Sequence, residues 1–166
     1  MIINIGERKI KINCEVLSHI YDKRQVNISD YESGGMLIGS IIRGTKDIII
    51  EDLTLPIKDD KCSRLNYVRS KKHNELLEQK WIDSQFTKMY FGEWHTHPQG
   101  DPFPSQRDIR NWKNLMKKSN TETNILLFII AGIDVFKIWI GDRERMKIYQ
   151  VFRGDYNGFR IDLCNY

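Results

Sequence analysis

The chain has 166 residues, the length of one ordinary domain, and we expect a single domain over residues 1–166. Its hydrophobic fraction of 40% is typical of a folded globular protein and excludes a disordered or collagen-like chain. The longest apolar run, Ile125 to Ile133, is far shorter than the roughly 20 residues that a helix needs to cross a membrane. We therefore expect no membrane-spanning helix.

The chain carries 26 basic and 22 acidic residues, which give a net charge of +4. Nucleic-acid-binding proteins usually have a stronger basic stripe with interleaved aromatic residues, so we expect neither a nucleic-acid nor a membrane partner. The N-terminal residues lack the basic start and apolar run of a secretory signal, which predicts a cytoplasmic protein. Cys14, Cys62 and Cys164 are widely spaced, which predicts reduced thiols and no thiolate zinc site.

The first part of the chain predicts one helix followed by a β-hairpin. The helix is expected over about residues 14–24, where apolar side chains recur at helical spacing. Two β-branched apolar runs, 36–42 and 48–55, flank a short glycine-containing loop, which is typical of a hairpin. Glu32 comes just before the first of these strands. Residues 59–64 are highly charged and predict a loop.

The rest of the chain predicts two further helices and four further strands. Leu76, Leu77 and Trp81 mark an amphipathic helix over about residues 70–86. The other elements are a strand at 89–97 that Pro98 ends, a helix with one face formed by Ile109, Trp112, Leu115 and Met116, and strands at 124–131, 135–140 and 147–153. This order predicts the α+β class, with a mixed, mostly antiparallel sheet flanked by helices.

Two histidines and three glycines accompany these elements. His19 and His73 fall on expected helices, and we predict that both are ordinary surface residues. Gly34, Gly35 and Gly39 are expected to permit turns and close backbone packing, and nothing in their spacing indicates a phosphate site.

The segment GEWHTHPQGDPFPSQRD, residues 92–108, contains the side chains best suited to metal binding or catalysis. On a strand, His95 and His97 point to the same face while Trp94 and Thr96 point to the other. Two neighbouring imidazoles suit a divalent metal ion, and a catalytic zinc ion usually takes three protein ligands and keeps a fourth position open. A His-x-His pair is nevertheless common on ordinary surface strands, so the pair alone does not decide the matter.

A third ligand is available at the start of the helix that follows the loop. Asp108 lies in the first turn of that helix, from which its carboxylate can point back toward the end of the strand. The same spacing, with Ser105 three residues earlier, also resembles a capping box, which requires no metal. Both interpretations of Ser105 and Asp108 remain open at this point.

Taken together, these residues resemble a known signature. Glu32, followed by HTHP, six residues and SQRD, is similar to the JAMM motif of the JAB/MPN zinc metallopeptidases. The resemblance extends over about residues 14–141 and implies the JAB/MPN fold, which is cytidine-deaminase-like. It also implies one Zn²⁺ per chain, bound by His95, His97 and Asp108.

The resemblance further implies two catalytic roles. Glu32 would be the general base that activates the zinc-bound water, and Ser105 would stabilise the oxyanion. The residues themselves leave Glu93 as a rival base, because it lies one strand step before His95 on the same face. The family pattern favours Glu32, which leaves Glu93 as a salt-bridge partner, a support for the metal site or a surface residue without a function.

Members of this family hydrolyse peptide or isopeptide bonds after the C-terminus of ubiquitin-like or conjugated proteins. The loop QGDPFP and the small size are most similar to the bacterial members, and among these to the deconjugating isopeptidases of CBASS antiphage operons. That resemblance implies a conjugated cGAS-like nucleotidyltransferase as substrate and an E1-E2-like conjugating enzyme as partner. A peptidase for another ubiquitin-like or sulfur-carrier protein, and a non-catalytic MPN interaction module, are the alternatives.

Overall fold

A computed structural model of the chain describes residues 1–156. Cys164 lies outside the described residues, so the prediction made for its thiol is not addressed by the structure. Cys14 and Cys62 are both free thiols, as expected. Within residues 1–156, no helix is both long enough and apolar enough to cross a membrane.

Helices and strands alternate irregularly along the chain. In order they are β1 Ile2–Ile5, β2 Arg8–Ile12, α1 Cys14–Asp22, β3 Gly34–Ile41, β4 Ile48–Leu53, β5 Lys61–Ser63, β6 Asn66–Val68, α2 Lys72–Asp83, β7 Met89–Thr96, α3 Gln106–Lys118, β8 Ile125–Ala131, β9 Val135–Asp142 and β10 Lys147–Asp155. All the elements expected from the sequence are present, with ends that differ by a few residues.

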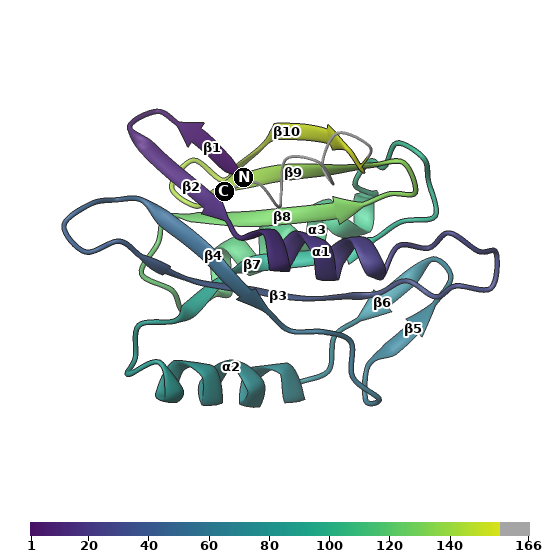
Figure 1. Cartoon of the computed structure of the whole chain (residues 1–166), viewed down its shortest axis with the longest axis horizontal. Coiled ribbons are helices and arrows are strands. Elements are labelled where there is room, and N and C mark those ends of the chain that lie inside the picture. The colour runs from purple at the N-terminus through teal and green to yellow at the C-terminus, as the bar shows by residue number, and fades with distance from the viewer. Residues whose placement is uncertain (157–166) are drawn as a thin grey trace.

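Eight of the strands form one twisted sheet in the order β1-β2-β4-β3-β7-β8-β9-β10 (Figure 1). The pairs β2–β4 and β7–β8 are parallel, and the other neighbouring strands of this sheet are antiparallel. β5 and β6 form a separate two-stranded hairpin. The prediction of an α+β protein with a mixed, mostly antiparallel sheet is therefore confirmed.

Helices cover both faces of the sheet. α1 packs against β4 and β7 on one face, where its buried residues join a large aliphatic core. On the other face α3 packs against β8 and β9, and α2 packs against β3 and β7 (Figure 1). Because both faces are covered, all seven residues of β8 are buried, which explains its uninterrupted apolar sequence. β7 lies beside β8 near the middle of the sheet and ends at the predicted site.

Two regions differ from the expectation. Residues 1–12 form the hairpin of β1 and β2, which the sequence analysis did not predict, and β5 lies within the expected loop at 59–64. β1 and β2 have only four and five residues, and although Ile10 and Ile12 of β2 alternate with lysines and are buried, this run is too short to stand out in the sequence. β5 has three residues, all exposed, and therefore shows no apolar alternation.

The buried side of α2 is also different from the prediction. The expected apolar face is largely in solvent, with Leu76 and Trp81 each about 40% exposed. His73, predicted to be a surface residue, is instead completely buried. Its ring lies between Thr54 and Asp60, and this polar network, rather than an apolar stripe, holds the N-terminal part of α2 on the protein. His19 is exposed, as predicted.

Glycine allows the close strand contacts around β3 and β7. A Cβ atom on Gly35 would lie 2.0 Å from the carbonyl oxygen of Thr54. Gly92 has a φ of +145°, and a Cβ atom there would lie 1.8 Å from the carbonyl oxygen of Leu127. A larger residue at Gly35 would push β3 away from Thr54, and one at Gly92 would push β7 away from β8. The predicted close packing is confirmed at Gly35, and Gly92 is an additional case.

Candidate metal centre

His95 lies near the C-terminal end of β7, His97 directly follows the strand, and their imidazoles approach each other. Their Nε2 atoms are 3.2 Å apart, and their ring centroids are 4.9 Å apart. The intervening Thr96 points to the opposite face, where its hydroxyl donates to Gln25 and accepts from the backbone N–H of Ser33. The strand alternation expected from the sequence therefore holds up to the point where the strand ends.

Asp108 approaches both imidazoles from the first turn of α3. Its Oδ1 atom is 3.5 Å from His95 Nε2, and its Oδ2 atom is 3.4 Å from His97 Nε2. The capping box is also present, because Ser105 Oγ accepts from the N–H of Asp108 and the Ser105 N–H donates to Asp108 Oδ2 at 2.6 Å. The two interpretations left open by the sequence are thus compatible, since the cap orients the carboxylate toward the histidines.

The spacing of these donor atoms fits a zinc ion. Tetrahedral ligands about 2.0–2.1 Å from zinc lie about 3.4 Å from one another. The three contacts among His95, His97 and Asp108 are 3.2, 3.4 and 3.5 Å long. Two imidazoles and one carboxylate are also a donor set that zinc takes in catalytic sites.

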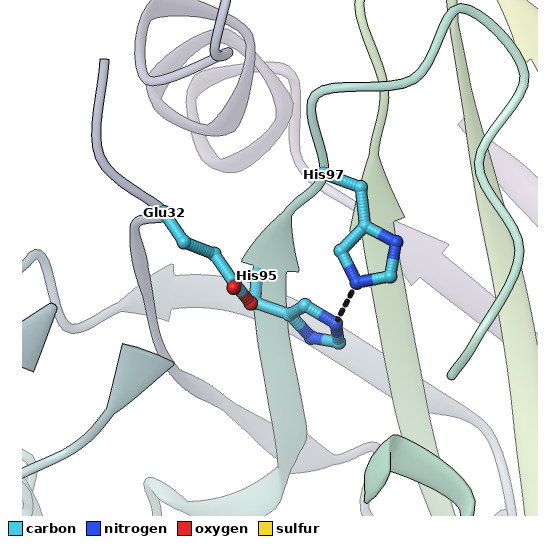
Figure 2. Close-up of side chains that lie close together, drawn as sticks. All are labelled: Glu32, His95 and His97. Carbon is cyan, nitrogen blue, oxygen red and sulfur yellow. Dashed lines mark hydrogen bonds between the residues drawn. The ribbon is translucent and has the colours of Figure 1, made fainter. Parts of the chain in front are cut away.

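Glu32 reaches the same place from the segment before β3. Its carboxylate and the two imidazoles converge, with one ligand atom from each residue within 4.8 Å of the other two (Figure 2). The Glu32 N–H donates to the carbonyl oxygen of Ser63 in β5, which ties this segment to the β5–β6 hairpin. By distance alone Glu32 could be a ligand, but the shorter contacts of Asp108 with both imidazoles favour Asp108.

The electrostatics of the cluster are strongly coupled. Burial raises the pKa of Glu32, and the nearby imidazoles only partly offset this effect. Burial acts to lower the pKa of His95, but the carboxylates of Asp108 and Glu32 outweigh it and raise that pKa. For Asp108, burial is outweighed by hydrogen bonds from His95 and His97, so its pKa is held far below the ordinary value. The carboxylates thus favour positive charge between them, which a metal cation would provide.

Glu93, the rival base, is already paired. Its Oε1 atom accepts from Arg69 Nε at 3.0 Å, and both side chains are about one-fifth exposed. Its negative charge contributes to the raised pKa of His95. The structure therefore bears out the salt-bridge interpretation of Glu93.

A cleft of about 610 Å³ opens beside these residues. Glu32, His97, Ser105 and Asp108 line it, together with residues of the β5–β6 hairpin, of the loop before α3 and of α3 itself: Arg64, Leu65, Asn66, Tyr67, Pro98, Gln99, Phe103, Pro104, Arg107 and Asn111. That these additional residues line a cleft was not predicted from the sequence. Asn111 could have been found, because it follows Asp108 by three residues on a helix and so shares its face. Tyr67 and Leu65 could not, because they come from the hairpin that the sequence did not predict.

Comparison with known proteins identifies the family. The family model described as prokaryotic homologs of the JAB domain matches residues 15–148. The chain belongs to this JAB-domain family. Among solved structures, the JAB domain is similar to the protein DSY2949 from Desulfitobacterium hafniense, with a TM-score of 0.57 over 85% of this chain and 88% of that one. The identity of 14% means that this likeness concerns the fold alone.

Curated relatives of this JAB domain share a single name, CD-NTase/cGAS isopeptidase. The protein from Pseudomonas aeruginosa is 37% identical over 108 residues, which cover 64% of this chain and 67% of the relative. The relative from Vibrio cholerae is 30% identical over 83% of both chains, and that from Escherichia coli is 34% identical over 86% of both. The resemblance inferred from the HTHP and SQRD motifs is confirmed.

Proposed function

We propose that this JAB domain is a zinc-dependent isopeptidase that releases conjugated proteins by cutting after a C-terminus. The observation that carries the proposal is the convergence of His95, His97 and Asp108 at distances suited to one zinc ion, with Glu32 beside them. His95, His97 and Asp108 hold the metal. When bound, zinc supplies Lewis acidity and lowers the pKa of a water molecule to about 7.

Glu32 and Ser105 carry out the remaining steps. The Glu32 carboxylate accepts a proton from the attacking water and delivers it to the departing amine as the C–N bond breaks. A carboxylate within reach of both the water and the amine can serve as the proton acceptor and then as the proton donor in one turnover. The Ser105 hydroxyl lines the cleft and donates a hydrogen bond to the carbonyl oxygen as negative charge develops there.

The substrate we propose is a cGAS-like nucleotidyltransferase joined through its C-terminus to another molecule. The names of the three relatives support this substrate. An E1-E2-like enzyme that forms the conjugate is the partner the proposal requires. The proposal places the reaction in the cytoplasm, as part of bacterial antiphage defence.

The test is a cleavage assay with a nucleotidyltransferase whose C-terminus is fused to a reporter protein. Zinc-loaded wild-type protein should release the reporter, as followed by gel electrophoresis and mass spectrometry of the new C-terminus. Cleavage of a ubiquitin-like or sulfur-carrier fusion in its place would contradict the substrate assignment. Failure of the metal-loaded protein to cut any of these fusions would favour a non-catalytic interaction module.

Two variants separate the metal ligand from the base. We expect Glu32→Gln to retain about one zinc per chain and to lose cleavage by about 10²-fold or more, because the proton acceptor is gone. Asp108→Asn should weaken zinc binding by at least about 10–100-fold, because a charged ligand is replaced by a neutral amide. Elemental analysis and competition with a chelator measure both effects. Loss of zinc in Glu32→Gln, with zinc retained in Asp108→Asn, would instead make Glu32 the third ligand.

A further inference from the structure

Lys137 is a lysine buried in the middle of β9. Its side chain is 2% exposed, although lysine is almost never buried without a partner. In the sheet, His95 of β7 is paired with Ile130 of β8, and Ile130 is paired with Lys137 of β9. Lys137 therefore lies two strands away from His95, in the same row of paired residues across the sheet. Phe136 and Ile138 point into the core beneath α1, so Lys137 points to the other face, which also carries His95. At the usual strand spacing the two residues are about 10 Å apart.

The loop between β7 and α3 covers this lysine with two side chains. Lys137 Nζ is 2.7 Å from Asp101 Oδ1 and 3.4 Å from the centre of the Phe103 ring. Arg153, the next residue in the row, is 3.5 Å from the same Asp101 oxygen but is half exposed. An ion pair and a cation–π contact thus meet on one buried ammonium group.

The backbone of the loop is attached at the same end of the sheet. The N–H of Ile133 donates to the carbonyl oxygen of Gln99, and the N–H groups of Asp134 and Val135 donate to that of Gly100. These bonds hold the first half of the loop. Beyond Gly100, the contacts of Asp101 and Phe103 with Lys137 extend the attachment toward the residues that lead into Ser105.

Phe103 is also one of two highly exposed apolar side chains that line the cleft. The Phe103 residue is 60% exposed and Leu65 is 74% exposed, and they come from two different segments. One face of the Phe103 ring covers the lysine, so the remainder of the ring is available to a molecule in the cleft. Large exposed apolar side chains beside a catalytic cleft suit contact with an apolar side chain of a substrate.

We propose that Lys137 is a positioning residue that holds Phe103 at the rim of the cleft, where Phe103 selects substrates with an apolar side chain next to the scissile bond. The proposal rests on the proposed function and adds the chemistry of the residue that the cleft prefers. Asp101 holds the ammonium group in place through their ion pair. Without Lys137, Phe103 loses the contact that orients its ring, although the zinc ligands and Glu32 are untouched.

Cleavage kinetics test whether Phe103 selects an apolar side chain. The probes are nucleotidyltransferase–reporter fusions in which the residue next to the cleaved bond is either leucine or alanine. In the wild type, kcat/KM for the leucine fusion should exceed that for the alanine fusion about tenfold. Phe103→Ala and Lys137→Met should each remove most of this preference by raising KM for the leucine fusion, with kcat changed less than about threefold. Lys137→Arg, which keeps the cation, should recover part of it.

Two further variants separate positioning from a merely structural role. The double variant Phe103→Ala with Lys137→Met should be no worse than either single variant, because both act through the same ring. Arg153→Met removes the exposed cation that also contacts Asp101 and should change KM less than twofold. Additive losses in the double variant, an equal loss in Arg153→Met, or an unchanged leucine preference in Lys137→Met would overturn the proposal.

Hydrogen exchange tests the attachment without any need for activity. In Lys137→Met the amides of Ile133 and Val135, which donate to the loop, should exchange about tenfold faster or more, while amides within β8 keep their wild-type rates. If the wild type cuts no fusion, the proposed function has failed and exchange alone decides whether Lys137 holds the loop. Unchanged exchange at Ile133 and Val135 would show that it does not.

Discussion

Ser105 and Asp108 illustrate how one pair of side chains serves two purposes at the start of α3. Their reciprocal hydrogen bonds satisfy free backbone N–H groups of the helix terminus. The same bonds hold the Asp108 carboxylate where both imidazoles contact it. A capping motif in the sequence therefore does not argue against a metal site, because in this chain the cap also orients the carboxylate proposed as a ligand.

The two roles of Ser105 can be separated by comparing alanine and glycine at this position. Both Ser105→Ala and Ser105→Gly remove the hydroxyl, so we expect the same loss of cleavage activity, about 10²–10³-fold. Alanine is a poor N-cap and should lower the free energy of unfolding by about 1 kcal/mol, whereas glycine should lower it by only a few tenths. Urea unfolding and the cleavage assay measure the two effects. A larger loss of activity in Ser105→Ala than in Ser105→Gly, parallel to the larger loss of stability, would contradict the catalytic role of the hydroxyl.

At the scale of elements, the β5–β6 hairpin links the proposed base to α2. Its strand β5 accepts the N–H of Glu32, and Tyr67 in β6 donates its hydroxyl to Asp60 at 2.8 Å. Asp60 in turn contacts His73 of α2 at 3.0 Å. Since the hairpin is small and mostly exposed, these polar contacts rather than apolar burial determine its position. The position of Glu32 therefore depends on a network outside the site.

Asp60 gives this network a defined dependence on pH. Burial alone would raise the pKa of Asp60, but hydrogen bonds from the N–H groups of Ile57 and Ser70 and from His73 lower it below its ordinary value. A carboxyl group with a lowered pKa in the folded state stabilises the protein above its unfolded pKa of about 4, and this contribution is lost as the pH falls through the folded value.

We therefore expect Asp60→Asn to lower the free energy of unfolding by about 1–3 kcal/mol at pH 7, because buried donors lose their charged acceptor. The difference from the wild type should shrink as the pH falls below about 4. Urea unfolding at several pH values measures it. Asp59→Asn is a matched control, because Asp59 is half exposed and, within residues 1–156, its one ion pair is with the exposed Lys72. An equal loss in both variants would contradict the role assigned to the buried network.

For the whole molecule, two apolar cores carry the fold of residues 1–156, and the candidate metal centre lies at their margin. One core lies between the sheet and α1, and the other lies between the sheet and α3. None of the residues proposed as zinc ligands belongs to either core. The protein should consequently fold without zinc, unlike small domains that depend on a structural metal.

Removal of zinc with a chelator should accordingly abolish cleavage but leave the far-ultraviolet circular dichroism spectrum at 25 °C unchanged. The free energy of unfolding should fall by about 4 kcal/mol relative to protein with free zinc at 1,000 times the dissociation constant, because the metal binds only the folded chain. Thermal unfolding with and without zinc checks this prediction. Loss of the folded spectrum on chelation would indicate a structural metal instead.

The sequence alone determined the α+β class, most of the sheet strands and the proximity of His95 to His97. These features depend on local periodicity, which two-residue and 3.6-residue spacings express directly. The tertiary structure alone decided which carboxylate is nearest the imidazoles, that Glu93 is paired with Arg69, and that His73 and Lys137 are buried. Each of these depends on contacts between segments far apart in the chain, and such contacts are set by the packing of the whole sheet rather than by any local pattern.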